Sequence, residues 1–281
     1  KIISQIAESH STIPILTHNN YSLPNFANEN TLIIISSYSG DTEETVSAME
    51  EAIKRNCEVA CITSGGKVGK LADKHNFNVI KVPGGNPPRA MLTYSLTQLL
   101  FICNHYGLIG DNFKNDLENS FELLNSELEN IKKQAKEITN RVKNTTILIY
   151  SDASYNGVGT RFKQQINENS KALSFSNVVP EMNHNELLGW NGGNETFSAI
   201  FLRNESDNKR NQFRMEISKE VIAAKAHTVE EIFSKGKSAI ENTLYLILIT
   251  DWISLYLANE YGVDSIEIKV IDRLKSELGK R

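Results

Sequence analysis

The sequence predicts an α/β protein with two doubly wound parallel sheets joined by a long helix. Short runs rich in Val and Ile alternate with longer stretches of helical spacing. Such strands, separated by helices, are typical of parallel sheets covered on both faces. A long polar stretch of helical spacing, residues 112–143, contains no proline or glycine. The regions before and after it share one plan of successive strand and helix units.

The expected strands are short apolar runs bounded by polar residues, a pattern that fits buried strands. Most are separated by stretches with apolar residues at helical spacing, such as Val46, Met49 and Ile53. The runs are 13–16, 32–35, 59–62 and 79–82 in the first half, and 146–150, 173–175 and 197–202 in the second.

The two halves differ at their beginnings. The second opens with TTILIYSDASYNGVGTRFKQQINENSK, residues 145–171, which predicts a strand, a glycine-bearing turn and a helix. The first opens with KIISQIAESH, which predicts a helix with Ile2, Ile3 and Ile6 on one side. If the halves are repeats, a strand and its glycine loop are expected before Lys1, and the given chain is truncated. A naturally shorter first half is the alternative.

Composition limits the classes of partner. The 281 residues are 40% hydrophobic and 23% charged, as in ordinary globular proteins. The net charge of −4 and the scattered basic residues give no reason to expect nucleic acid or an anionic membrane as a partner. Cys57, Cys61 and Cys103 lie on apolar segments, which indicates small buried side chains in a reducing compartment. We therefore expect a cytoplasmic protein.

Hydroxyl groups crowd the corner that follows the run 32–35, where the sequence reads SSYSGDT. At the carboxyl end of a parallel strand, the first N–H groups of the next helix lack partners and favour an anion. Ser37, Ser39 and Thr42 can each donate a hydrogen bond to one phosphate, and Gly40 lets the backbone approach it closely. We predict a phosphate site, formed without any lysine or arginine in the loop.

The alternative explanation of this corner is ordinary helix capping. Asp41 and Glu44 have the spacing of a capping box, and acidic residues are common in the first turn of a helix. Four hydroxyl groups are more than one cap requires, so the phosphate site is the favoured interpretation.

Other chemistries fit the sequence poorly. The six histidines form no His-x-His or His-Glu-x-x-His pattern, so no zinc site is expected. The segment Gly157-Val158-Gly159 matches only part of the GxGxxG pattern of dinucleotide-binding proteins, so no dinucleotide site is predicted. Tyr150 and Trp190 are interpreted as core or interface residues and not as a base-stacking platform. We expect neither a metal nor a cofactor.

Several segments carry a resemblance to a known family. Residues 37–42, SYSGDT, resemble the phosphate loop of sugar isomerase (SIS) domains. The segments PGGNPPRAML, GTRFKQQINENSK, EMNHNELLGW and VIDRLKSEL resemble the bifunctional phosphoglucose/phosphomannose isomerases of archaea and bacteria. The resemblance covers both halves and the order of the motifs.

The resemblance implies two SIS domains with flavodoxin-like sheets, a homodimer, and a metal-free exchange of aldose and ketose 6-phosphates. The first SIS domain would be residues 1–110, the connecting helix 111–143, and the second SIS domain 144–281 with a C-terminal helix. The substrate would be a phosphorylated hexose. The reaction requires ring opening, removal of a proton beside the carbonyl, and stabilisation of a cis-enediolate.

Two residues of the second half match the proton-transferring groups of the family. Glu168, in QQINENSK, matches the catalytic base, and its place on a helix after a glycine-bearing turn is expected to face the crevice at the strand ends. Glu181 and Glu186 are the rival bases. His184, in EMNHNEL, matches the histidine that assists ring opening and reaches the active site of the neighbouring subunit. Its reference pKa near 6.5 suits proton exchange at neutral pH.

Two cationic residues match further positions of the family. Arg89, in NPPRAML, matches the arginine near the enediolate oxygens, and we expect it at the start of a helix beginning near Ala90. A solvated surface arginine is the alternative. Lys275, in VIDRLKSEL, matches the lysine that approaches the ring oxygen and hydroxyls of the substrate. Lys269 and Lys280 lie close to it in the sequence and make that match less specific.

The sequence thus predicts an isomerase that interconverts glucose 6-phosphate and fructose 6-phosphate. Mannose 6-phosphate is expected as a second aldose substrate. A sugar-phosphate sensor would keep the serine loop but has no reason to keep Glu168, His184, Arg89 and Lys275 together. An isomerase of another phosphosugar is the third possibility. If the opening strand and glycine loop are absent from the protein, its substrate pocket is incomplete.

Overall fold

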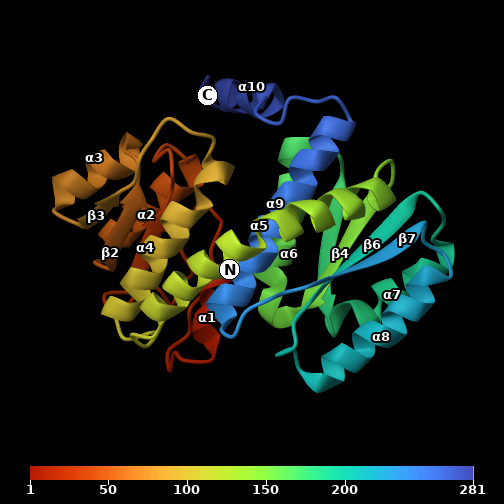
Figure 1. Ribbon diagram of the computed structural model, residues 1–281. Helices are drawn as coiled ribbons and strands as arrows, with labels where there is room; N and C mark the ends of the chain where they lie inside the picture. The colour runs from red at the N-terminus through yellow and green to blue at the C-terminus, as the bar shows by residue number, and fades with distance from the viewer. Residues whose placement is uncertain (281) are drawn as a thin grey trace. The chain divides into compact units, whose positions relative to one another are not determined.

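The computed structural model describes residues 1–280, which form two compact units. The first unit is Ala7–Asp111, and the second combines Lys1–Ile6 with the chain from Asn112 onward. Each unit contains one parallel sheet with helices packed on it (Figure 1). Arg281, the last residue of the predicted second domain, lies outside the described residues.

The described part of the first unit forms a sheet of order β1-β2-β3 with all pairs parallel. Helices α2 and α3 cover one face of this sheet and α4 covers the other. Its elements are β1 (Leu32–Ser36), α2 (Glu43–Lys54), β2 (Glu58–Thr63), α3 (Gly66–His75), β3 (Asn78–Lys81), the 3₁₀ turn η1 (Pro88–Met91) and α4 (Leu92–His105); helix α1 (Ile2–Glu8) spans the division between the units.

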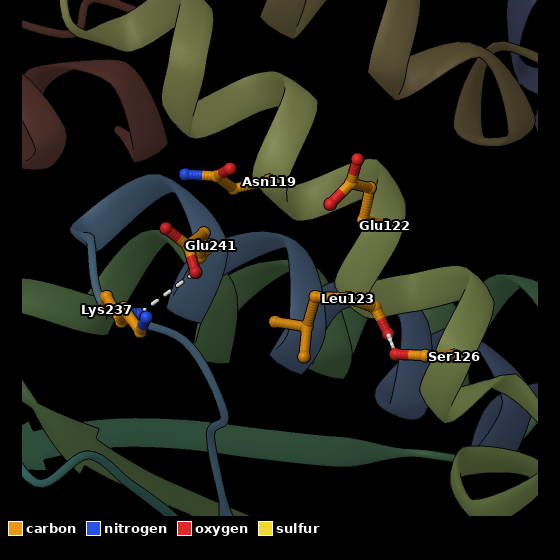
Figure 2. A pocket seen from close by; sticks show the side chains of 6 residues that line it. All are labelled: Asn119, Glu122, Leu123, Ser126, Lys237 and Glu241. Atoms are coloured by element: carbon orange, nitrogen blue, oxygen red, sulfur yellow. Dashed lines mark hydrogen bonds between the residues drawn. The ribbon is translucent and has the colours of Figure 1, made fainter.

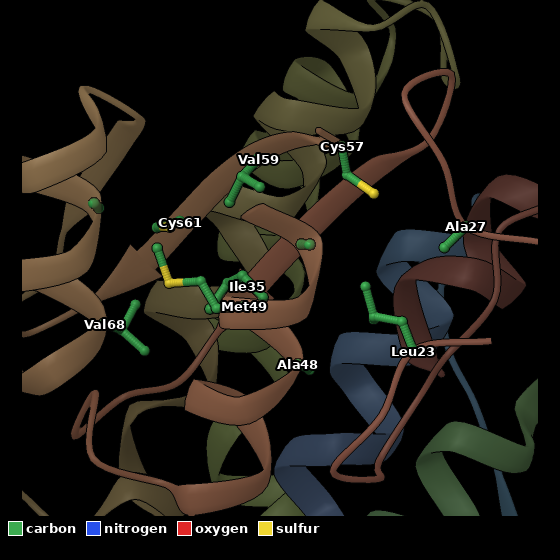
Figure 3. Packing of buried hydrophobic residues seen from close by; sticks show 11 residues of the cluster. Leu23, Ala27, Ile35, Ala48, Met49, Cys57, Val59, Cys61 and Val68 are labelled. Carbon is green, nitrogen blue, oxygen red and sulfur yellow. The ribbon is translucent and has the colours of Figure 1, made fainter. Parts of the chain in front are cut away.

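The core of the first unit lies between α2, α3 and the sheet. Met49 and Val68 are fully buried there beside Cys61 of β2 (Figure 3). All three cysteines are free and buried, as the sequence predicts, and burial raises the pKa of Cys61 to about 11. A thiol with so high a pKa stays protonated and behaves as a small apolar side chain.

The described part of the second unit forms a parallel sheet of order β5-β4-β6-β7. Helices α5, α6 and α9 cover one face and α7 and α8 the other (Figure 1). Its elements are α5 (Phe113–Val142), β4 (Thr146–Asp152), the 3₁₀ turn η2 (Ala153–Tyr155), α6 (Asn156–Ser170), β5 (Ser174–Val179), the 3₁₀ turn η3 (Glu181–His184), α7 (Glu186–Gly189), the 3₁₀ turn η4 (Trp190–Gly192), β6 (Phe197–Arg203), α8 (Lys209–Ala223), β7 (Thr228–Phe233), α9 (Ala239–Glu260) and α10 (Lys269–Leu278).

Helix α9 is the centre of the layer on the first face. It packs along α5 and against α6, and most of its residues from Ile240 to Ala258 are buried. The other face holds Tyr150 and Trp190 in a second core, together with Phe201 and Met215. The interpretation of Tyr150 and Trp190 as core residues is therefore confirmed.

The predicted fold class is confirmed, since both sheets are parallel and covered on both faces. The long helix predicted over 112–143 is confirmed as α5, and the N-terminal helix as α1. Six of the seven predicted strands are present. None of the helices within residues 1–280 is both long and apolar enough to span a membrane.

One predicted strand is wrong. Residues 13–16 are irregular, and Ile13 and Leu16 are 59% and 68% exposed. The run contains Pro14, which has no N–H to donate, and it pairs with no strand of the described sheet. An apolar run without a neighbouring strand cannot satisfy its backbone groups by sheet formation.

Candidate active site

The serine loop follows β1 at its carboxyl end and leads into α2. Ser37 is buried, and its hydroxyl donates to Thr42 Oγ1 at 3.2 Å and accepts from Gly40 N at 3.2 Å. Ser39 is exposed, and its Oγ accepts from Asp41 N at 3.3 Å. The three hydroxyls are therefore held in one tight turn by bonds within the loop.

The capping-box alternative for this loop is wrong. The residue before α2 is Thr42, whose side chain makes no capping hydrogen bond to the described first turn. The Asp41 carboxylate instead accepts from Lys67 N, at the start of α3, at 3.0 Å. The amino end of α2 thus keeps the positive end of its dipole without a side-chain acceptor from this loop.

Two glycines interlock the serine loop with the turn after β2. Gly40 has φ +73°, and a Cβ there would lie 1.9 Å from the carbonyl oxygen of Gly65. Gly66 has φ +67°, and a Cβ there would lie 2.4 Å from the carbonyl oxygen of Ser39. Val68 N also donates to the Gly40 carbonyl at 2.9 Å. The close approach that the sequence assigns to Gly40 is thus an approach to a neighbouring turn.

Arg89 lies in the turn η1 that follows β3, and its side chain is half-buried. The regular helix expected near Ala90 begins at Leu92, because the Pro87–Pro88 pair leads first into a 3₁₀ turn. The carboxyl ends of parallel neighbours meet at one edge of a sheet, so Arg89 and the serine loop follow strands at the same edge.

Glu168 lies in the last turn of α6 and is half-buried. The end of this helix is tied to α9, since Asn169 Nδ2 donates to Ser254 Oγ at 2.9 Å and Ser170 Oγ to the Ser254 carbonyl at 2.7 Å. Helix α6 starts at the carboxyl end of β4 and runs back along the sheet, so its last turn reaches the amino end of β5.

His184 lies at the opposite end of β5, in the turn η3, and is exposed. The segment around it is anchored to the sheet. Met182 and Trp190 are buried, and Glu186 accepts from Tyr150 Oη at 2.7 Å and from Asn177 Nδ2 at 2.6 Å. These contacts fix the backbone on both sides of His184 and leave its imidazole facing outward.

The rivals of Glu168 have other partners. Both carboxylate oxygens of Glu186 accept hydrogen bonds from side chains of the sheet. Glu181 is exposed and accepts from Asn185 Nδ2 at 3.3 Å.

Lys275 is exposed on α10, and none of the residues of that helix is buried.

Sequence reasoning missed a buried polar cluster at the carboxyl ends of β4 and β6. Asp152 accepts from Ser154 Oγ and Asn211 Nδ2, both at 2.7 Å. Asp207 accepts from Asn204 N at 2.9 Å, and burial raises the pKa of Asp207 to about 6. The available signal was the pair of polar residues that follows each of the two predicted apolar runs, Ser151-Asp152 after 146–150 and Arg203-Asn204 after 197–202.

The pocket in Figure 2 has a volume of about 420 Å³ and lies beside the amino end of α9. Glu241 is buried there and accepts from Lys237 N at 3.0 Å. The predicted site residues do not line it. Within residues 1–280, no group of three or more His, Cys, Asp or Glu side chains could hold a metal ion.

Comparison with known proteins gives consistent matches. Residues 131–278 match the family model "Bacterial phospho-glucose isomerase C-terminal SIS domain". A bifunctional phosphoglucose/phosphomannose isomerase of Aquifex aeolicus is 36% identical over 269 residues, covering 95% of this chain and 82% of its own. A protein of the same name from Caldicellulosiruptor bescii is 37% identical over 279 residues, with the same coverage.

The solved structures extend the comparison to the fold. The C-terminal domain of glucosamine-fructose-6-phosphate aminotransferase from Francisella tularensis superposes with a TM-score of 0.76. The match covers 95% of this chain and 82% of that one at 13% identity. At that identity the match establishes the shared fold of the two chains.

Proposed function

Because the chain belongs to the bifunctional phosphoglucose/phosphomannose isomerase family, we propose that it interconverts glucose 6-phosphate, and also mannose 6-phosphate, with fructose 6-phosphate. The observation that carries this proposal is the serine loop at the carboxyl end of β1, with an amino end of α2 that its own side chains leave uncapped. We assign phosphate binding to residues 1–110 and proton transfer to residues 144–281, with 111–143 as the connecting helix.

The phosphate is bound by neutral donors in this proposal. Ser37, Ser39 and Thr42 donate from their hydroxyls, and the dipole of α2 favours the anion. The loop contains no lysine or arginine. Neutral donors hold a dianion without a buried countercharge, which suits a metabolite that must leave after each turnover.

Glu168 is the base that moves the proton. Its carboxylate takes the proton from C2 of the open-chain aldose, and the electron pair forms the C1–C2 double bond of a cis-enediolate as the carbonyl oxygen gains charge. Arg89 stabilises that charge. Transfer of the hydroxyl proton from O2 to O1, return of the carbon proton to C1 and formation of the carbonyl at C2 give the ketose, so no atom or electron is gained or lost. The reaction proceeds without a cofactor.

His184 assists ring opening from a second copy of the chain. Within one chain, Glu168 and His184 lie at opposite ends of β5, and a strand of six residues spans about 20 Å. A single chain therefore does not offer both groups to one sugar, whereas a homodimer can. Lys275 orients the ring oxygen and hydroxyls of the sugar substrate.

The buried free cysteines support a reducing compartment, the cytoplasm.

The first experiment measures turnover of fructose 6-phosphate by the full-length protein and follows the glucose and mannose products separately. Glu168→Gln should lower kcat by several orders of magnitude while phosphosugar binding persists, and Glu181→Gln is the matched control that should retain activity. Turnover should survive a chelator. Binding without turnover in the wild type would instead identify a sugar-phosphate sensor, and turnover of other phosphosugars alone would identify a different isomerase.

A mixing experiment tests the shared site. Glu168→Gln and His184→Ala chains should each be inactive. Mixed with subunit exchange, they form heterodimers in which one of two sites has both residues intact, so about a quarter of wild-type activity should return. If no activity returns although heterodimers form, the two residues do not act across an interface.

A further inference from the structure

Tyr38 lies in the serine loop and makes hydrogen bonds to both neighbouring turns. Its carbonyl oxygen accepts from Ser64 N at 2.9 Å and from Ser64 Oγ at 2.7 Å, in the turn after β2. Its hydroxyl oxygen accepts from Asn86 N at 3.2 Å, in the segment after β3. Because β2 lies between β1 and β3 in the sheet, Tyr38 connects the turns that follow all three strands.

The ring of Tyr38 is held in place by packing. It is half-buried and packs against the apolar cluster of Ile62, Val82 and Ile102, which lies between the sheet and α4. A side chain packed in this way keeps one rotamer. The hydroxyl oxygen therefore has a fixed position relative to the serine loop.

The segment that this hydroxyl holds has few other constraints. Residues 83–86 read PGGN and are exposed, and a Cβ added at Gly85 would meet nothing within 4 Å. A pair of glycines also leaves the backbone more conformational freedom than other residues do. The hydrogen bond from Asn86 N to Tyr38 thus restricts a segment that packing leaves free at Gly85.

A stiff connection joins Asn86 to Arg89. Pro87 and Pro88 stand between them, and a proline ring fixes φ near −65°. Pro87 has φ −57° and ψ 131°, and the chain then enters η1 with Arg89 as its second residue. The position of Arg89 therefore follows from the position of Asn86.

We propose that Tyr38 is a positioning residue that holds Arg89 at a fixed place relative to the serine loop. The backbone of Tyr38 belongs to the loop that binds the phosphate, and its hydroxyl fixes the start of the segment that carries Arg89. The inference rests on the proposed function, in which Arg89 stabilises the charge of the enediolate. A fixed guanidinium acts on charge that develops in the transition state, so its place affects kcat more than substrate binding.

The test compares Tyr38→Phe with Tyr106→Phe in the full-length protein. Tyr38→Phe keeps the packed ring and removes the acceptor of Asn86 N. It should lower kcat about tenfold, because Arg89 is then less well placed, without a matching rise in KM for fructose 6-phosphate. The thermal midpoint should stay near that of the wild type, since water can replace the acceptor at the exposed Asn86.

Tyr106→Phe is the matched control. The Tyr106 hydroxyl donates to Glu58, the first residue of β2, and so lies at the opposite edge of the same sheet. Its removal should leave kcat at the wild-type value. An unchanged kcat in Tyr38→Phe would overturn the proposal.

A double-mutant cycle distinguishes positioning of Arg89 from a direct contact between Tyr38 and the substrate. Arg89→Ala removes the guanidinium, so Tyr38→Phe added to it should lower kcat no further. If Tyr38→Phe lowers kcat by the same factor with and without Arg89, Tyr38 does not act through Arg89 and the proposal is wrong.

Hydrogen exchange separates this inference from the assignment of the protein as an isomerase. The Asn86 amide should exchange faster in Tyr38→Phe than in the wild type, and at the wild-type rate in Tyr106→Phe. This measurement requires no turnover. A wild type that converts no phosphosugar would reject the isomerase, whereas equal exchange at Asn86 in all three proteins would show that Tyr38 does not hold the segment.

Discussion

The Tyr150 hydroxyl of β4 donates a hydrogen bond of 2.7 Å to the carboxylate of Glu186, 36 residues further along the chain. Trp190 Nε1 donates to the same hydroxyl at 2.9 Å, and Tyr150 is fully buried. The three side chains fix both ends of α7 to the sheet. The hydrogen bond between Tyr150 and Glu186 therefore connects the core to the surface on which His184 lies.

Removal of this hydroxyl should destabilise the fold. Burial and the Glu186 carboxylate raise the pKa of Tyr150, so the hydroxyl remains a donor at all ordinary pH values. Tyr150→Phe leaves Trp190 Nε1 and Glu186 short of a partner and should cost about 1–3 kcal/mol of unfolding free energy. Glu186→Gln keeps an acceptor for Tyr150 and should cost less. Equal losses in urea unfolding would contradict this account.

Gly40→Ala should break the interlock between the turns after β1 and β2. The positive φ costs about 1–2 kcal/mol for an alanine, and the added Cβ would meet the Gly65 carbonyl oxygen at 1.9 Å. Gly107→Ala is the matched control, since Gly107 has φ +69° with nothing within 4 Å of an added Cβ. We expect Gly40→Ala to lose clearly more stability than Gly107→Ala and to raise KM for the phosphosugar. Similar thermal midpoints for both variants would argue against the steric contact.

The elements that sequence reasoning found are those in which local pattern and tertiary role agree. The runs that became β2, β4 and β6 are mostly buried and the run that became β1 is mostly half-buried, so an apolar composition marks all four as strands. Strand β7, Thr228–Phe233, was not predicted, and Glu230 and Glu231 interrupt its apolar run. In the structure Glu230 pairs with Arg141 at 2.6 Å, and Glu231 pairs with Arg203 and with Lys219. Such pairing depends on residues far away in the sequence.

The candidate site was harder to place than the strands. Motifs indicated the serine loop, Arg89, Glu168 and His184, but a motif on a helix does not tell which end of the sheet it reaches. That end follows from the length of α6: its 15 residues return Glu168 to the start of β5. The buried Asp152 and Asp207 were not found because each looks like an ordinary loop acid until two strands bring them together.

Asp207 should make stability depend on pH. Burial, together with the nearby Asp152 charge, raises the pKa of Asp207 to about 6 from its ordinary 3.8. The folded protein therefore holds this proton more tightly than the unfolded chain. Its stabilising contribution is fully present below about pH 4 and is lost as the pH rises through about 6, a change on the order of 3 kcal/mol.

The variant Asp207→Asn isolates this effect, because an amide oxygen can still accept from Asn204 N. Relative to the wild type, the variant should gain unfolding free energy between pH 4 and pH 7. Asp264→Asn, at an exposed aspartate, is the control for the loss of one charge. Parallel pH profiles for Asp207→Asn and the wild type would show that Asp207 does not titrate in this range.

Ser37→Ala and Ser39→Ala should separate loop structure from phosphate binding. Ser37 is buried, and its Oγ is the acceptor for Gly40 N, so alanine should cost about 1–3 kcal/mol of stability and also raise KM. Ser39 is exposed, and its hydroxyl makes one long bond of 3.3 Å within the loop. Ser39→Ala should leave the unfolding free energy within about 0.5 kcal/mol of wild type while raising KM for fructose 6-phosphate severalfold with a smaller change in kcat. If Ser39→Ala leaves KM unchanged, Ser39 does not bind the phosphate, and the uncapped amino end of α2 must act with Ser37 and Thr42 alone.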